Sequence, residues 1–348
     1  MTDGSPSSGG AGRGVSHPES PAPHVTEEPA GTLPPSLQKS IAKLIRPEYV
    51  LVGFLLALVL FFTWQNPVFL GLNNFRNVLL SVAVLGILAV PSTLLLVSAN
   101  VDLSVASNAA FCGMVVAIVG GDYGIAAGVA AAVVAGTALG AFNGFLVAGV
   151  GINSIITTLG TLAIFRGMAR LSSNGQTVRV DGFTFLGSDT TFGLPHGVIV
   201  LVIVAVTFYL VMRYTVFGRS VYAIGSNPHA ARLSGIRLRT NLFLVFTMTG
   251  LCAALAGLIL TSQLRAGTPV AATGLELSVV AAVLLGGASL TGGRGTVIGT
   301  ILGVLILGTL NNGMTILNVS SFWQEIARGS VLIIAVGLDQ LRIRLSGT

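Results

Sequence analysis

Long apolar stretches follow one another along most of the chain, and the charged residues lie mainly in the short segments between them. About ten runs approach the roughly 20 residues that an α-helix needs to cross a bilayer, at residues 50–64, 77–98, 103–120, 124–148, 153–171, 197–212, 241–262, 276–290, 296–313 and 325–340. Only 9% of the residues are charged, whereas a soluble domain carries about 25%. The surface must therefore face lipid, and we predict an all-α polytopic membrane protein with about ten transmembrane helices.

The first 40 residues differ from the rest, because they are rich in Pro, Gly and Ser and have no apolar face. We expect residues 1–40 to form a disordered cytoplasmic tail and residues 41–348 to form the transmembrane domain. Lys and Arg are enriched in cytoplasmic loops. With ten spans and both termini cytoplasmic, twelve of the 18 Lys and Arg residues lie inside. The same alternation makes 213–240 a cytoplasmic loop and 172–196 an external loop.

Two of the predicted spans carry similar ladders of small residues, each ending in an Asn-Gly pair. The ladder glycines of the fourth and ninth spans are Gly136, Gly140, Gly144, Gly299, Gly303 and Gly308. These two spans run in opposite directions in the predicted topology, as an inverted repeat of five plus five spans requires. The alternative is a chance similarity, because small residues recur wherever membrane helices pack closely.

The predicted cytoplasmic loop 213–240 contains five arginines and no acidic residue. Asn227 is a favourable N-cap, Pro228 suits the first helical position, and Gly235 can end the helix. This pattern predicts a short surface helix that fits the groove of a partner protein; the alternative is a loop whose arginines meet anionic lipid. The residues expected to form the partner contact are Gly218, Arg219, Asn227, Ala230, Ala231, Leu233, Ser234 and Gly235.

A few polar residues lie inside the apolar runs or at their ends. Asp102 lies between the second and third spans, where it can cap a helix start together with Ser104; an ion site is the alternative. Glu276 and Glu325 lie near external helix starts, where the helix dipole favours a carboxylate; contact with an arginine of a partner protein is the alternative. Uncharged polar groups either line a path for a hydroxyl-rich solute or fasten helices together, and these candidates are Asn143, Thr157, Thr158, Asn311 and Asn312.

The sequence contains no pattern typical of catalysis or of a resident cofactor. The Walker A pattern G-x-x-x-x-G-K-[ST] is absent, and we find no nucleophile–base pair or HExxH motif. The glycine-rich run 286–295 follows an apolar helix, so we interpret it as a tight turn. Cys112 and Cys252 lie inside apolar runs, and the four histidines have no metal-ligand spacing. We therefore expect no enzyme activity, no metal and no nucleic-acid partner.

Several segments resemble, in the same order along the chain, the permeases of ribose-type ABC importers for ribose, xylose, arabinose and galactosides. Ala230–Ile236 (AARLSGI) is similar to that family's ATPase-coupling loop, with His229 where a glutamate is often found. Val101–Val105 (VDLSV) resembles the family's IDLSV segment. The other similar segments are Asn143-Gly144, Thr158–Thr161, Arg166-Gly167, Gly274–Leu277, Gly286–Gly295 and Asn311–Gly313.

The resemblance implies the permease subunit of an ATP-binding cassette importer in a bacterial cytoplasmic membrane, which moves a monosaccharide inward by alternating access. It also implies a second permease copy, a cytoplasmic ATPase that holds ATP and Mg²⁺, and an extracytoplasmic sugar-binding protein. The binding protein sets most of the selectivity in such systems, so the resemblance does not name the sugar. Two alternatives stay open at this point. One is a permease for branched-chain amino acids, and the other is an ion-coupled secondary transporter, which usually carries intramembrane carboxylates.

Overall fold

The computed structural model describes residues 47–187, 189–191 and 193–345. By its contacts the chain divides into Met1–Leu44 and Ile45–Thr348, and the described residues all belong to the second unit. The predicted disordered tail, residues 1–40, lies outside the described residues.

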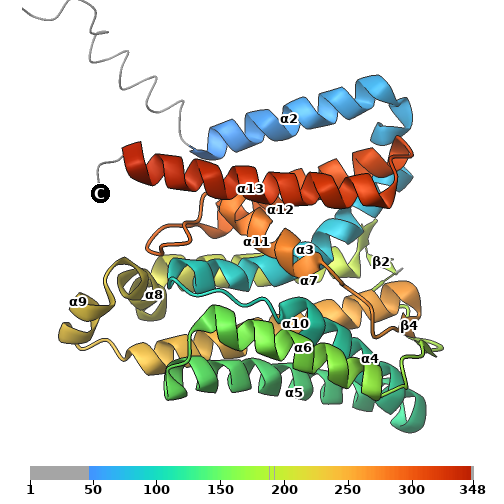
Figure 1. Cartoon of the computed structure of the whole chain (residues 1–348). Coiled ribbons are helices and arrows are strands. Elements are labelled where there is room, and N and C mark those ends of the chain that lie inside the picture. The colour runs from blue at the N-terminus through green and yellow to red at the C-terminus, as the bar shows by residue number, and fades with distance from the viewer. Residues whose placement is uncertain (1–46, 188, 192, 346–348) are drawn as a thin grey trace, which may run out of the picture. The chain divides into compact units, whose positions relative to one another are not determined.

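Helices form most of the described part of the chain (Figure 1). They are α2 (Pro47–Gln65), the 3-10 turn η1 (Pro67–Leu70), α3 (Leu72–Val97), α4 (Val105–Tyr123), α5 (Ile125–Gly144), the π-helical segment η2 (Phe145–Val150), α6 (Ser154–Leu171), α7 (His196–Tyr214), α8 (Val216–Ser226), α9 (Pro228–Leu233), α10 (Leu238–Leu264), α11 (Leu275–Leu285), α12 (Val297–Ile316) and α13 (Ser321–Leu345). This confirms the predicted all-α polytopic class.

Seven helical segments in the described ranges are long and apolar enough to cross a membrane: α2, α3, α4, α5 continued by η2, α7, α10 and α12. The remaining predicted spans correspond to α6, α11 and α13, which are not among the seven. α11 has only 11 residues, too few to cross a bilayer as a helix. The number of crossings and the side on which the termini lie therefore stay predictions.

Helices α4 and α11 each begin after a non-helical segment of seven or more residues. α4 follows the extended segment 98–104, and α11 follows the turn-rich segment 265–274, which contains β4 (Ala266–Gly267). The predicted run 276–290 is wrong at its C-terminal end, because α11 stops at Leu285. A Cβ on Gly286 would lie 2.5 Å from the Gly299 carbonyl on α12, and Gly287 adopts a φ of +89°. This close approach and the left-handed backbone end the helix.

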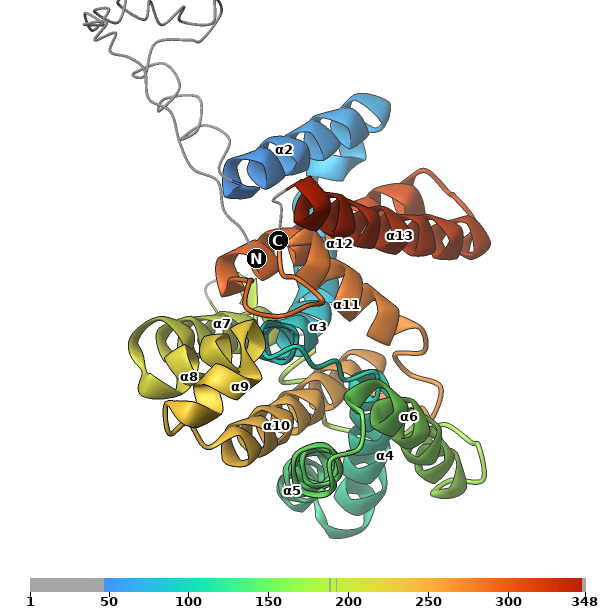
Figure 2. The same cartoon turned by 60° about the vertical axis from the view of Figure 1, so that its left-hand side comes forward.

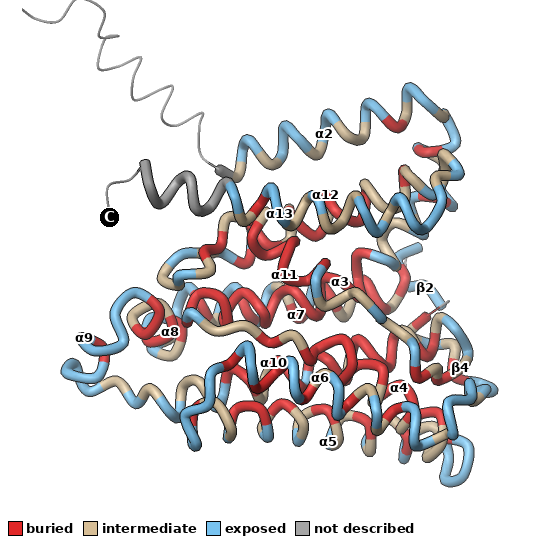
Figure 3. Tube along the Cα trace, viewed as in Figure 1, coloured by how far each residue is buried: buried red, intermediate tan, exposed pale blue. Residues whose placement is uncertain are grey.

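The long helices α10 and α12 organise the packing. α10 packs against α3, α4 and α5, whereas α12 packs against α2, α3 and α11. Figure 3 shows that buried residues concentrate along α3 and α10. The contacts among α4, α5, α6 and α10 have counterparts among α11, α12, α13 and α3. An inverted repeat would produce this correspondence, and the repeat itself stays a prediction.

Both glycine ladders lie where helix backbones touch. A Cβ on Gly140 of α5 would lie 2.5 Å from the Phe246 carbonyl oxygen and 2.7 Å from the Gly250 Cα on α10. On α12, a Cβ on Gly303 would overlap the Ala282 carbonyl oxygen of α11. Small residues at such positions let membrane helices approach closely, so the ladders have a packing role whether or not they mark a repeat.

The segment 172–196 is more structured than a soluble loop. β1 (Val178–Arg179) pairs antiparallel with β4 (Ala266–Gly267), and β2 (Thr190–Thr191) pairs with β3 (Leu194–Pro195). The side chains of Val180 and Phe183 are buried in a cluster with residues of α4 and α10. Part of the segment therefore belongs to the core, and its location outside the membrane stays a prediction.

Candidate partner-binding surface and polar path

Two short helices, α8 and α9, lie together at one end of the bundle (Figure 1). The sequence predicts only one short helix here, which corresponds to α9. As a correction, residues 216–226 form a second helix, α8. Thr215 Oγ1 accepts a hydrogen bond from the Gly218 amide at 3.1 Å and caps α8. Val221, Ile224 and Gly225 form its buried face. Their spacing of three and four residues is the signal that could have revealed the helix.

α9 confirms the predicted short helix. Asn227 Oδ1 accepts a hydrogen bond from the Ala230 amide at 3.0 Å, and Pro228 occupies the first helical position. Gly235 follows the helix with a φ of +80°, a backbone conformation that favours glycine. Both ends of α9 are therefore fixed by local chemistry.

The outer face of α8 and α9 combines basic and apolar side chains. Leu233 is 78% exposed, and Arg219 and Arg232 are also exposed. Gly218 and Ala231 are buried, so these two predicted contact residues support the fold of the surface. The other predicted contact residues are exposed: Arg219, Asn227, Ala230, Leu233, Ser234 and Gly235. An exposed leucine among arginines suits a partner groove with an apolar floor and an acidic rim.

α8 packs against two segments that are distant in the sequence, the end of α3 and the glycine-rich run 286–295 (Figure 2). A Cβ on Gly225 would overlap the Val97 carbonyl oxygen and lie 2.7 Å from the Gly293 amide nitrogen. The Gly293 amide donates a hydrogen bond to the same Val97 carbonyl at 2.8 Å. We call the contact of Val97, Gly225, Gly292 and Gly293 the glycine junction. The run interpreted as a turn is thus also a contact surface for α8.

Tyr222 joins α8 to the glycine-rich run at a second point. Its Oη donates a hydrogen bond to the Gly295 carbonyl oxygen at 2.6 Å. Burial raises the pKa of the Tyr222 phenol, and the positive charge of Arg213 partly opposes this shift. The hydroxyl therefore stays protonated, and remains a donor, at physiological pH.

Tyr222→Phe is expected to lower the thermal-denaturation midpoint of the purified protein. The change removes one hydrogen bond and leaves the Gly295 carbonyl without this donor, which costs about 1–2 kcal/mol. Tyr214→Phe is the control, because Tyr214 lies at the same end of the bundle and is exposed. Equal midpoints for the two variants would show that the Tyr222 bond does not hold α8 in place.

Asp102 is buried in the extended segment between α3 and α4. Its Oδ1 accepts hydrogen bonds from the Ser104 amide at 2.8 Å and from the Ser104 hydroxyl at 2.6 Å. Asn143 on α5 donates through Nδ2 to Ser104 Oγ at 2.8 Å. Asp102 and Ser104 are therefore paired, but they do not form the predicted helix cap. Ser104 precedes α4 without capping it through its side chain, and it links Asp102 to Asn143.

α6 is joined to the same extended segment. Thr158 Oγ1 donates to the Val101 carbonyl oxygen at 3.4 Å, and Ser154 Oγ accepts from the Val101 amide at 3.4 Å. Asp102, Ser104, Asn143 and Thr158 therefore form what we call the central polar cluster. Ser154 is a member of this region that the sequence did not single out.

Some buried polar atoms near these elements have unused hydrogen-bonding capacity. In the part of the chain that the structure describes, Asn143 Oδ1 on α5 and Thr157 Oγ1 on α6 lack hydrogen-bond partners. Ser278 Oγ on α11 also lacks one. Buried polar groups are normally paired, so these atoms are available to a transient partner such as water or a hydroxyl-bearing solute.

Arg166 on α6 holds the turn-rich segment that precedes α11. Its Nη1 donates hydrogen bonds to the Pro269 carbonyl at 3.0 Å and to the Ala271 carbonyl at 2.7 Å. Glu276, in the first turn of α11, is half-buried and interacts electrostatically with Arg166. Glu325 lies on α13 and is exposed. The docking role considered for Glu276 and Glu325 stays a prediction.

Arg166→Met is expected to accelerate amide hydrogen exchange across residues 265–274. Hydrogen bonds from a charged donor are worth about 1.5–3 kcal/mol, so losing both should speed local opening by about tenfold or more. Hydrogen-exchange mass spectrometry measures this directly. Arg170→Met, one turn later and exposed, is the matched control. Unchanged exchange in Arg166→Met would show that Arg166 does not hold the segment.

Asn311 and Asn312 lie apart from the central polar cluster, in the second half of α12. Asn312 Nδ2 donates to Asn74 Oδ1 at 2.9 Å, which joins α12 to α3. This bond favours the helix-fastening role for Asn312. Asn311 Oδ1 is buried and has no hydrogen-bond partner among the described residues, so a path-lining role for Asn311 stays a prediction.

The described side chains offer no grouped metal ligands. No three His, Cys, Asp or Glu residues come together within the ranges that the structure describes. Cys112 and Cys252 are buried as free thiols, and Cys112 Sγ donates to Asn108 Oδ1 at 3.3 Å. The two cysteines therefore serve packing between helices.

The chain is similar in sequence to known transport proteins. The family model described as branched-chain amino acid transport system / permease component matches residues 74–336. The L-arabinose ABC transporter permease protein of Azospirillum brasilense is 38% identical over 328 residues, which cover 93% of this chain and 94% of that protein. The ribose import permease protein of Escherichia coli K12 is 39% identical over 292 residues, 82% of this chain and 91% of that protein.

A third relative, the L-arabinose transport system permease protein of Escherichia coli K12, is 38% identical over 285 residues, 81% of this chain and 87% of that protein. No solved structure matches the chain. The matched region, residues 74–336, covers nearly all of α3 and every element from α4 to α12. It includes the exposed face of α8 and α9, the glycine junction and the central polar cluster. The resemblance to ABC importer permeases is thus confirmed, and the chain belongs to the branched-chain amino acid transport system / permease component family of membrane proteins.

Proposed function

We propose that this chain is the membrane-spanning subunit of an ATP-driven importer for a monosaccharide, with a pentose such as ribose or L-arabinose as the first candidate. The observation that carries the proposal is the similarity, at 38–39% identity over most of the chain, to permeases named for those two sugars. ATP hydrolysis belongs to a separate cytoplasmic subunit that holds ATP and Mg²⁺. A second permease copy and an extracytoplasmic sugar-binding protein complete the assembly, which lies in the bacterial cytoplasmic membrane.

The partner-binding surface on α8 and α9 is the contact for the ATPase in this proposal. Movement of α9 passes to α8 and, through the glycine junction, to Val97 and Gly293. Val97 ends α3 just before the extended segment that carries Asp102, and Gly293 lies between α11 and α12. The segment that carries Asp102 and the glycine-rich run between α11 and α12 are therefore both joined to the ATPase contact in this proposal. ATP can shift the conformational equilibrium only through contacts that differ between the two states, and the glycine junction is where such contacts are transmitted.

The path for the sugar passes the starts of α4 and α11 in this proposal, where each helix follows a non-helical segment. Broken helices at the centre of a bundle are common solute sites in transporters. The unpaired polar atoms of Asn143, Thr157 and Ser278 are uncharged, which suits weak and brief contacts with sugar hydroxyl groups. Glu325, and at lower exposure Glu276, are the docking candidates for the binding protein.

The experiment reconstitutes the permease with its ATPase and binding protein in vesicles and measures ATP-dependent uptake of labelled ribose and L-arabinose. Leu233→Asp should reduce ATPase association in pull-down by about tenfold or more, because it places a charge at a central apolar contact. Leu171→Asp is the matched control, since Leu171 is also 78% exposed but lies at the end of α6. Undiminished ATPase association in Leu233→Asp would disprove the assigned coupling surface.

A branched-chain amino acid permease is the alternative that the sequence left open, and the family model supports it only through its broad family name. The same vesicles distinguish the two candidates when labelled leucine replaces the sugar. Uptake of leucine without uptake of ribose or L-arabinose would overturn the sugar assignment. It would leave the coupling surface intact.

A further inference from the structure

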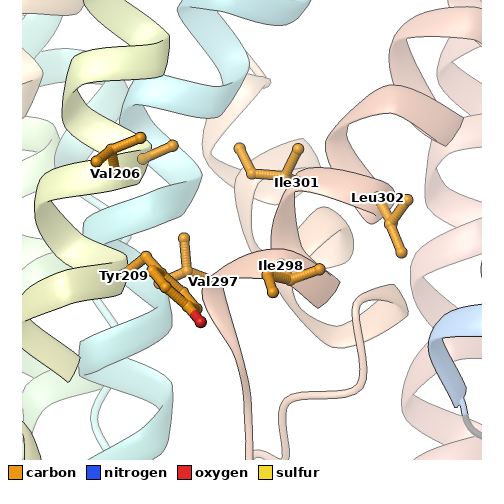
Figure 4. Close-up of a pocket in the computed structure, with 7 residues that line it drawn as sticks. Val206, Tyr209, Val297, Ile298, Ile301 and Leu302 are labelled. Carbon is orange, nitrogen blue, oxygen red and sulfur yellow. The ribbon is translucent and has the colours of Figure 1, made fainter. Parts of the chain in front are cut away.

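An apolar groove lies between α7 and α12, on the surface of two helices that are long enough to span the membrane (Figure 4). Its volume is about 280 Å³. The lining residues are Ala205, Val206, Tyr209, Val297, Ile298, Ile301 and Leu302. Val206 and Ile298 are half exposed, so the groove opens sideways from the bundle. Its position on membrane-spanning helices means that it opens toward hydrocarbon rather than toward water.

A polar hollow of about 320 Å³ lies next to the groove, at the end of the bundle that carries α8 and α9. It is lined by Glu48, Tyr222, Gly286, Gly287, Arg294, Gly295 and Thr296. Thr296 lines the hollow and Val297 lines the groove, so the two meet at the start of α12. The lining thus changes from apolar side chains in the groove to polar and charged groups in the hollow at the start of α12.

The order of these surfaces matches the order of chemical groups in a phospholipid. An acyl chain needs an apolar groove inside the membrane, and a headgroup needs polar partners at its edge. Tyr209 lies at the lower end of the groove in Figure 4, beside Val297. Tyrosine is typical of the membrane–water boundary, where its ring faces hydrocarbon and its hydroxyl faces water.

The hollow contains one basic and one acidic side chain, Arg294 and Glu48, and these favour some lipid headgroups over others. Arg294 is exposed and offers a guanidinium to a phosphate, and the first turn of α12 directs its partial positive charge to the same place. Glu48 is half-buried and offers a carboxylate. A carboxylate favours a headgroup that also carries an ammonium, and it disfavours a headgroup with negative charge alone.

We infer that the groove and the hollow together form a binding site for one glycerophospholipid with an ethanolamine headgroup. One acyl chain lies between α7 and α12, the phosphate meets Arg294, and the ammonium meets Glu48. The site adjoins Tyr222 and Gly295, whose hydrogen bond holds α8. A bound lipid therefore supports the element that carries the ATPase contact in the proposed function. The lipid site itself rests only on the chain being a membrane protein, and not on the solute it carries.

The test uses full-length permease reconstituted in vesicles of equal phosphatidylethanolamine and phosphatidylglycerol, then extracted in mild detergent and examined by native mass spectrometry. The wild type should retain one phosphatidylethanolamine per chain in preference to phosphatidylglycerol. Val206→Trp fills the groove and should lower this retention by about tenfold. Leu210→Trp adds the same side chain one turn away on α7, outside the lining residues, and should retain the lipid.

Two headgroup variants separate the charges. Arg294→Gln should lower retention of both lipids, whereas Glu48→Gln should remove the preference for phosphatidylethanolamine. Wild-type protein that retains both lipids equally, or Val206→Trp that retains as much as Leu210→Trp, would overturn the proposal. Sugar uptake is measured separately on the same vesicles, so a failure of the transport assignment is distinguishable from a failure of the lipid site.

Discussion

Gly225→Val is expected to displace α8 from the bundle and to abolish ATP-driven uptake. The added Cβ would overlap the Val97 carbonyl oxygen and approach the Gly293 amide nitrogen to 2.7 Å. Both obstacles are backbone atoms, and these two atoms are hydrogen-bonded to each other, so neither can rotate away as a side chain would. Overpacking a core costs typically about 1–3 kcal/mol, occasionally more, and we expect about 3 kcal/mol or more here because backbone must move.

Two measurements separate the possible outcomes of the Gly225 change. The thermal-denaturation midpoint in detergent reports the stability, and uptake in vesicles with the ATPase and binding protein reports the coupling. Gly53→Val is the matched control, because Gly53 lies on α2 and a Cβ there would meet no atom within 4 Å. It should leave both measurements close to the wild-type values. Normal uptake by Gly225→Val would show that the glycine junction is not needed to transmit movement.

Most of the helical framework could be predicted from the sequence for one physical reason. A membrane-spanning segment must satisfy its backbone hydrogen bonds internally, so an apolar run of sufficient length is read as a helix without knowledge of its neighbours. α9 was predictable for a similar local reason, because Asn227, Pro228 and Gly235 encode its ends. α8 was missed because its buried face contains only two large apolar residues, Val221 and Ile224, and is otherwise made of glycine and serine.

The contacts between residues that are distant in the sequence could not be predicted from local patterns. Ser104 and Asn143 are 39 residues apart in the sequence, and Asn74 and Asn312 are 238 residues apart. No spacing rule links such pairs, so the polar candidates could be named but not grouped. The glycine-rich run shows the same limit, because a turn is encoded locally while its contact with Gly225 depends on packing. The strand pairing of β1 with β4 also depends on an encounter between distant segments.

The structure explains how one acidic residue, Asp102, can lie deep in the helical bundle. Asp102 accepts two hydrogen bonds from Ser104, and Ser104 in turn accepts one from Asn143. These bonds give Asp102 a role in holding the extended segment at the start of α4. An ion-coupled transporter would instead need the carboxylate to bind and release a cation or a proton during each cycle.

Asp102→Ala and Asp102→Asn together decide between these two roles. The alanine change removes the acceptor for the Ser104 amide and hydroxyl, and each buried donor left unpaired costs about 1–3 kcal/mol. We therefore expect a total loss of about 2–6 kcal/mol and little folded protein. The asparagine change keeps a side-chain oxygen in the position of Oδ1, so the denaturation midpoint and ATP-driven uptake should remain close to wild type.

Asp122→Ala is the control for the loss of a carboxylate, because Asp122 is exposed near the other end of α4. A stable Asp102→Asn protein that no longer transports, even with a functional ATPase, would point to cation or proton binding at residue 102. Retained uptake in Asp102→Asn and a collapsed fold in Asp102→Ala would instead assign the carboxylate to structure. That outcome would remove ion coupling at Asp102 and would agree with entry of the energy at α8 and α9, as the proposed function states.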